Sequence, residues 1–182
     1  TFIDEIVIKQ LMSFGCQPLF KLDKKDFITE VSDLWVIPIS TTKFYEGENQ
    51  ELIFGEGENF ITGEGRFNSY TMRKGDNTLI CKGDSNILTC SNRDNVLVKG
   101  KLNRIYCFGE DNVILLDDSY NSVSTMNTTG NVIIVNSYGN SISVVKGSNV
   151  VVLLGNKNHV NVIGDYNTVI NVGKENILNT CH

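Results

Sequence analysis

From residue 47 onward, apolar and polar residues alternate in short runs that recur about every nine residues. Each run follows an Asn, and the residues two and four positions after that Asn are mostly Ile, Leu, Val, Met or Cys. The anchors are Asn49, Asn59, Asn68, Asn77, Asn86, Asn95, Asn103, Asn112, Asn121, Asn131, Asn140, Asn149, Asn158, Asn167 and Asn176. Of the fourteen steps between them, eleven are nine residues, two are ten and one is eight. Alternation with a period of two, rich in β-branched residues, is typical of short strands.

Each unit, G-x-x-N-x-φ-x-φ-x with φ apolar, therefore predicts one strand and one corner. The apolar alternation argues against a disordered low-complexity tract, because such a tract buries no regular face. Units of this kind stack so that every coil is buried by its neighbours. Equivalent Asn side chains can then hydrogen-bond along the stack as amide ladders. The sequence predicts an all-β, parallel β-solenoid (β-helix or β-roll).

The size of one coil follows from the positions one and three residues after each Asn, which point outward. These positions are apolar in alternate units, such as Val132 and Ile134, and polar in the units between, such as Ser122 and Ser124. A three-unit coil would mix the two sets on every face, whereas a two-unit coil separates them. We therefore predict two-sided coils of about 18 residues, about seven in number, roughly 35 Å long in total at ~4.8 Å per coil.

The nonapeptide spacing resembles the β-roll of secreted calcium-binding repeat proteins. The resemblance covers the period and the coil size. The G-G-x-G-x-D core of those repeats is absent here, so the resemblance does not carry over their calcium sites.

The first 44 residues do not repeat. Residues 1–14 carry apolar side chains at helical spacing, and residues 23–35 show a second such pattern before an extended lead-in at 35–39. We predict an N-terminal α-helical cap at 1–44 and the solenoid at 45–182. A cap would cover the open edges of the first coil. The alternative is that 1–44 forms a partner-binding or anchoring module.

The apolar outward rows predict an interface. They contain Val96, Val98, Val113, Leu115, Val132, Ile134, Val150, Val152 and Ile170. A patch on the order of 300 Å² is large for a free surface. Three covers are open: a second copy packed face to face, the 1–44 segment folded back, or another partner such as a protein or a lipid surface. The leading interpretation is a non-enzymatic structural protein that self-associates through this face as a homodimer or higher oligomer.

The opposite, polar face is a candidate ligand surface. Its outward residues include Arg104, Tyr106, Ser122, Ser124, Ser141 and His159. These side chains suit a carbohydrate, and a carbohydrate-binding or glycan-active module is the alternative function. Ser141 and His159 are 18 residues apart and would stack in adjacent coils, as a nucleophile and a base do. The residue beside them is Asn161 rather than a carboxylate, and the sheet is flat. We therefore expect no catalysis there.

Two further columns follow from an 18-residue coil. Glu58, Asp76, Asp94 and Asp111 each precede an anchor and would form an acidic column, a weak candidate for Ca²⁺ because its ligands are all oxygen. Ordinary turn residues are the competing interpretation. Cys90 and Cys107 would stack one coil apart, within disulfide range or as buried thiols, and we favour free thiols. In a 27-residue coil Cys81 would take the place of Cys90.

The composition limits the partners, cofactors and cellular locations that the protein can have. The 182 residues carry a net charge of −5 with a pI of about 5.0, which argues against nucleic acid as the partner. No apolar run reaches the ~18 residues of a transmembrane helix. Two His and five Cys without a C-x-x-C pair give no zinc spacing, so we expect no cofactor. An extracellular, cell-surface or virion location fits best, and a cytoplasmic one is also compatible.

Overall fold

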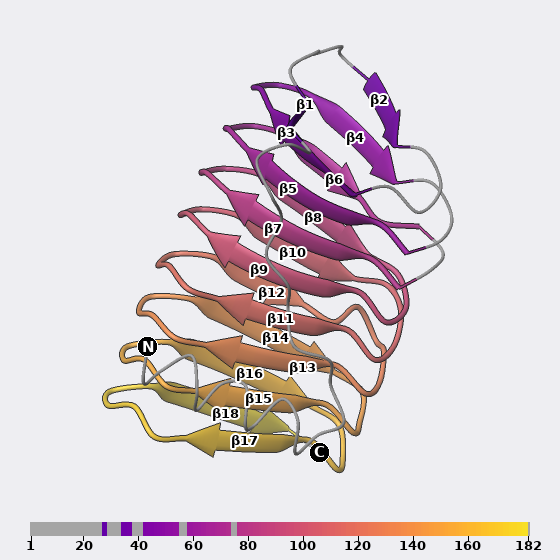
Figure 1. The fold of residues 1–182 in the computed structure, drawn as a ribbon. Coiled ribbons are helices and arrows are strands. Elements are labelled where there is room, and N and C mark those ends of the chain that lie inside the picture. The colour runs from indigo at the N-terminus through magenta and orange to yellow at the C-terminus, as the bar shows by residue number, and fades with distance from the viewer. Residues whose placement is uncertain (1–26, 29–33, 38–41, 55–57, 74–75, 182) are drawn as a thin grey trace.

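A computed structural model of the chain describes residues 27–28, 34–37, 42–54, 58–73 and 76–181, and side chains from residue 44 onward. The described strands form two parallel sheets of nine strands each (Figure 1). Sheet A contains β1 (Phe27–Ile28), β3 (Thr42–Glu46), β5 (Phe60–Glu64), β7 (Thr78–Lys82), β9 (Asn95–Lys99), β11 (Val113–Leu116), β13 (Val132–Val135), β15 (Val150–Leu153) and β17 (Thr168–Asn171). Sheet B contains β2 (Leu34–Ile37), β4 (Glu51–Phe54), β6 (Ser69–Thr71), β8 (Ile87–Cys90), β10 (Arg104–Cys107), β12 (Ser122–Ser124), β14 (Ser141–Val145), β16 (His159–Ile163) and β18 (Ile177–Cys181).

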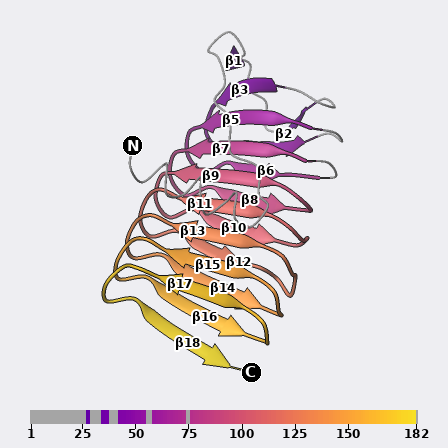
Figure 2. The same ribbon diagram turned by 60° about the horizontal axis from the view of Figure 1, so that its bottom comes forward.

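Successive strands alternate between the two sheets, and each pairs in parallel with the strand two places later. Ile114 pairs with Ile133 in sheet A, and Val160 pairs with Leu178 in sheet B. The latter pair is separated by 18 residues, which confirms the predicted two-unit coil. The fourteen strands from β5 to β18 therefore make seven turns, and Figure 2 shows them as successive rungs.

The main core lies between the sheets. The positions two and four residues after each anchor point inward, as predicted, and Leu79, Ile114 and Leu153 are fully buried there. The largest side chains concentrate in the first coils, where Tyr70 faces Gly63. A β-carbon on Gly63 would lie 2.4 Å from the Tyr70 hydroxyl, so glycine is the residue that admits the ring.

Buried Asn side chains connect the coils at both edges of the solenoid. The Asn131 amide nitrogen Nδ2 donates to Oδ1 of Asn149 (3.1 Å), and the Asn131 backbone N–H donates to the same oxygen (3.0 Å). Asn103 makes the same two bonds to Asn121. A buried corner needs such partners, because an unpaired backbone N–H would cost free energy.

Two predicted anchors are one residue away from the true position. Asp94, not Asn95, takes the ladder place between Asn77 and Asn112. Similarly, the backbone N–H of Gln50, and not that of Asn49, donates to Oδ1 of Asn68. The physical reason is burial: an Asn95 anchor would point Lys99 into the core, whereas an Asp94 anchor buries two valines.

Val96 and Val98 therefore point inward, contrary to the predicted outward placement. Both are fully buried in the core between the sheets. Asn95 and Leu97 take the outward places, in register with Val113 and Leu115.

Strands occupy part of the region predicted as a helical cap. The second predicted helix, 23–35, is wrong where it is described, because β1 and the start of β2 fall within it. They pair with β3 and β4, so the two sheets begin before residue 45. The predicted helix at 1–14 lies outside the described residues. Within the described ranges, no helix is long and apolar enough to cross a membrane.

Candidate functional site

The outer face of sheet A is apolar and largely buried from β11 to β15. Ile134 and Val152 are 0% exposed, and Val113 and Val132 are 4% exposed, although all four point away from the core between the sheets. Leu115, Val150, Leu154 and Ile170 pack against them as partly buried neighbours. Seven of the nine predicted interface residues thus lie together in outward columns. The binding of another molecule to this face stays a prediction.

The outer face of sheet B is open. Arg104, Ser122, Ser141 and His159 form one in-register outward column, and Tyr106 and Ser124 belong to the next, as predicted. Ile87, which precedes Arg104 in the first column, is 44% exposed. Between Ser69 and Asn179, the two described outward columns contain no carboxylate.

A shallow groove of about 480 Å³ lies where strands β8, β10 and β12 begin. It is lined by Ser85, Asn86, Ile87, Leu102, Asn103, Arg104, Tyr120 and Ser122. Ser85, Leu102 and Tyr120 occupy the same corner position in successive coils, each at φ of 59° to 60°. This left-handed conformation turns the side chains outward from the corner. The short Ser85 side chain, beside Leu102 and Tyr120, leaves room for the hollow.

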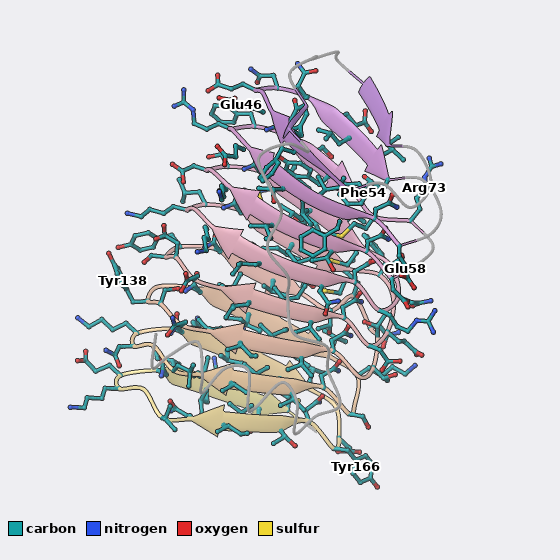
Figure 3. All side chains as sticks on the ribbon, in the orientation of Figure 1. Glu46, Phe54, Glu58, Arg73, Tyr138 and Tyr166 are labelled. Atoms are coloured by element: carbon teal, nitrogen blue, oxygen red, sulfur yellow. The ribbon has the colours of Figure 1, made fainter. Side chains whose placement is uncertain are left out.

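The ring of Tyr120 is held at the rim of this groove. It packs edge-on against Tyr138, with ring centroids 5.5 Å apart, and Figure 3 shows Tyr138 projecting from the edge of the solenoid. The ring also lies over Gly139, where a β-carbon would approach Cε1 to 2.8 Å. Tyr120 nevertheless remains 52% exposed. The groove therefore has an aromatic side chain that is fixed in place and open to solvent.

Polar groups around the groove keep their hydrogen-bonding capacity. Among the described residues, the side chains of Ser85, Arg104, Tyr120 and Ser122 make no hydrogen bond or ion pair. The amides of Asn86 and Asn103, in contrast, are buried and engaged in the ladder. The groove combines free donors and acceptors with the apolar surfaces of Leu102 and Tyr120.

Sequence reasoning found Arg104 and Ser122 but missed the corner residues. The outward positions were predicted for the strands alone. Leu102 and Tyr120 lie in the corners instead, immediately before the anchors Asn103 and Asn121. A signal was present: Phe67 occupies the same place before Asn68. Large apolar residues at a turn position that usually holds polar ones indicate a surface feature.

Ser141 and His159 lie side by side but do not hydrogen-bond to each other. They are in-register neighbours on β14 and β16. Nε2 of His159 lies 2.8 Å from Nδ2 of Asn179. The Asn179 amide nitrogen also donates to Oδ1 of Asn161 (3.0 Å). The His–Asn contact occupies the ring nitrogen that a general base would use.

The predicted acidic column is interrupted. Asp94 points into the ladder, and Arg93 takes its place at the surface, where it forms an ion pair with Asp76 at 2.8 Å. Glu58 and Asp111 remain exposed at this edge, and Figure 3 shows Glu58 projecting from it. No group of three or more His, Cys, Asp or Glu suited to a metal occurs in the described part of the chain.

Asp94 is a buried carboxyl in an otherwise amide ladder. Oδ1 accepts from Asn77, and Oδ2 accepts from the Ser91 backbone N–H at 2.7 Å. Desolvation by burial outweighs these bonds and raises the pKa of Asp94 to about 6.

Cys90 and Cys107 are buried free thiols in register with each other, as the 18-residue coil predicts. The hydrogen bond to Cys107, together with burial, raises the pKa of Cys90. Cys81 lies on the other sheet, and burial raises its pKa to about 12. Thiols with raised pKa values are poor nucleophiles, so this geometry favours a packing role.

Comparisons with known proteins found no match: no family model, no curated protein and no solved structure is significantly similar to this chain.

Proposed function

We propose that this protein is a non-enzymatic binding module that holds an extended glycan on the outer face of sheet B. The observation that carries the proposal is the groove at the start of β8, β10 and β12. There an aromatic ring packed on its neighbours, an unpaired guanidinium and free hydroxyls meet on an otherwise flat, open face. Sites for small ligands combine apolar walls with a few polar groups in this way.

The chemistry of a sugar suits these groups. One face of a pyranose ring presents C–H groups, which pack on an aromatic side chain such as Tyr120. Sugar hydroxyls both donate and accept, as do the free hydroxyls of Ser85 and Ser122. The adjacent coils at about 4.8 Å spacing repeat the polar positions along the stack, which favours a chain-like ligand.

The charge of the face indicates an acidic group on the glycan. Arg104 has no counter-charge among the described residues, and the outward columns around it lack carboxylates. A guanidinium binds a carboxylate or a sulfate through two parallel hydrogen bonds. The protein's net charge of −5 opposes long-range attraction, so this local contact must act at short range.

The test is a glycan array with uronate, sulfated and neutral oligosaccharides, followed by calorimetric titration of the best ligand. We expect Tyr120→Ala to weaken binding by up to about tenfold, within the ~0.5–1.5 kcal/mol range for losing an aromatic contact. Arg104→Gln should weaken acidic ligands and leave neutral ones unchanged. Tyr166→Ala is the matched control, because Tyr166 is 88% exposed at a corner that leads into sheet A.

If the protein binds none of the three glycan classes on the array, the proposal is refuted. Equal losses in Tyr120→Ala and Tyr166→Ala would also contradict it, since binding would then not involve the groove.

Self-association through the outer face of sheet A, which the sequence predicts, stays a prediction. It is supported by the apolar columns themselves, of which Leu115, Val150 and Ile170 are only partly buried in the single chain. A face-to-face dimer would have to displace whatever buries Ile134 and Val152. Partner binding by residues 1–44 also stays a prediction, since most of that segment lies outside the described residues.

A further inference from the structure

The outer face of sheet A behaves as a second core, yet no described strand covers it. All described strands belong to the two sheets themselves. The burial is extensive: Phe44, Thr62 and Ile80 on β3, β5 and β7 are each under 9% exposed, and Ile134 and Val152 are fully buried further along. These residues form one in-register outward column, in which Leu97 and Leu115 are half-buried.

Sheet B shows what an outward position looks like without a cover. Its corresponding column contains Thr71, Thr89, Tyr106, Ser124 and Ser143, and every one of them is half-buried. In the neighbouring column, Ile87 is 44% exposed where Val132 of sheet A is 4% exposed. The backbone geometry is shared, so a covering segment must cause the difference.

The length of chain outside the described ranges limits the choice of cover. The internal gaps are 29–33, 38–41, 55–57 and 74–75, each too short to follow a face from β3 to β15. Residues 1–26 precede β1 at the end of sheet A. From β1 to β15 is roughly 34 Å at ~4.8 Å per strand, and 12 extended residues reach about 40 Å.

The sequence of residues 1–14 supplies the matching chemistry. Ile3, Ile6, Val7, Leu11 and Phe14 recur at helical spacing, while Lys9 falls on the other side of that pattern. Fourteen residues at helical rise would extend about 21 Å. The apolar cluster from β11 to β17 extends roughly 14 Å across three strand spacings, so the two lengths are compatible.

We propose that residues 1–26 bind the outer face of sheet A within the same chain and keep that face from associating with a second copy. The occupant is thus the chain's own N-terminal segment. The apolar pattern that predicts a dimer interface then belongs to an intramolecular contact, and the protein is monomeric while this contact persists.

The experiment measures thiol labelling in the full chain, with each site quantified by peptide mass. Val132→Cys reports on sheet A, and Ser141→Cys, in the equivalent position of the next unit, reports on sheet B. We expect the sheet A thiol to react at least about tenfold more slowly than the sheet B thiol, because it reacts only when the cover opens. Ile6→Glu with Leu11→Glu should accelerate it severalfold and leave the sheet B rate unchanged.

Lys9→Glu is the matched control, because it changes the net charge by the same −2 on the other side of the segment. It should leave both rates as they are. The unchanged sheet B rate and the circular dichroism spectrum show that the variants keep their fold.

Three results would overturn the proposal. The sheet A thiol could react as fast as the sheet B thiol. It could stay slow in the Ile6→Glu/Leu11→Glu variant, which would assign the cover to something else. Finally, light scattering could give a dimer mass together with labelling that accelerates on dilution, which would make a second copy the occupant.

Discussion

The two outer faces of the solenoid share one backbone and differ in everything that side chains determine. Both are parallel sheets with the same 18-residue register and the same two outward columns. On sheet A these columns contain Val132 and Ile134 and are buried. On sheet B the equivalent places are Ser141 and Ser143, which remain accessible. The repeat thus fixes geometry, and alternate units separate an apolar, buried face from a polar, accessible one.

The largest expected effect comes from placing a charge on each face at equivalent positions. Ile134→Lys buries an ammonium among Val113, Val132 and Val152, so it should cost about 3–5 kcal/mol of unfolding free energy. Ser143→Lys, three residues after the next anchor, should change stability by less than ~0.5 kcal/mol. Urea unfolding followed by circular dichroism measures both. Equal small effects would mean that sheet A is as open as sheet B.

The second prediction compares the ladders that lead into the two sheets. The ladder before sheet A contains Asp94, whose pKa of about 6 lies above its unfolded value. A raised pKa favours the neutral form in the folded state. The stabilisation is therefore full below about pH 4 and is lost as pH rises through 6. Relative to Asp94→Asn, the wild type should lose up to about 3 kcal/mol between pH 4 and pH 8.

The reciprocal variant sharpens this comparison. Asn103→Asp places a carboxyl at the equivalent buried position of the ladder before sheet B and should introduce a pH dependence of the same sign. Urea titrations at several pH values measure both differences. A difference between wild type and Asp94→Asn that is flat with pH would contradict the burial argument.

The smallest expected effect concerns the support of the groove on sheet B. Gly139 has φ of +69° and lies beneath the Tyr120 ring. Gly139→Ala should cost about 1 kcal/mol from backbone strain and weaken glycan binding severalfold by displacing the ring. In the Tyr120→Ala background the same change should leave binding unaffected, because the two act through one contact. Additive losses in titration calorimetry would show that Gly139 acts elsewhere.

Most of the architecture could be predicted because each unit repeats the same physical demand. Each strand buries two side chains in the core, and the corner before it buries an amide. These two demands leave little freedom in the register of the strands. The two errors at Asn95 and Asn49 arose where Asn stood beside another polar residue that could occupy the ladder. In both places the inward side chains decide, since the core excludes Lys99 and Glu51 and admits Val96 and Leu52.

The candidate site was less predictable. Arg104 and Ser122 follow from strand alternation, whereas the groove depends on corner side chains and on the space that Ser85 leaves beside Leu102 and Tyr120. The corner backbone repeats from coil to coil, with φ of 59° to 60° at Ser85, Leu102 and Tyr120, but the corner side chains differ. Neighbouring coils decide which of these side chains meet. In the second predicted helix, the described residues 27–28 and 34–35 are strand for a related reason: they pair with β3 and β4, and such tertiary contacts override local preference.

By itself, the sequence determined the solenoid, its coil size, and the division into an apolar face and a polar face. A period of nine with alternating outward chemistry allows one two-sided arrangement, and burial enforces it over seven turns. Only the tertiary structure decided that Ile134 and Val152 are enclosed while Tyr120 and Arg104 remain open. The exposure of a side chain depends on what covers its sheet and on which corners become neighbours. The period of the strands determines neither.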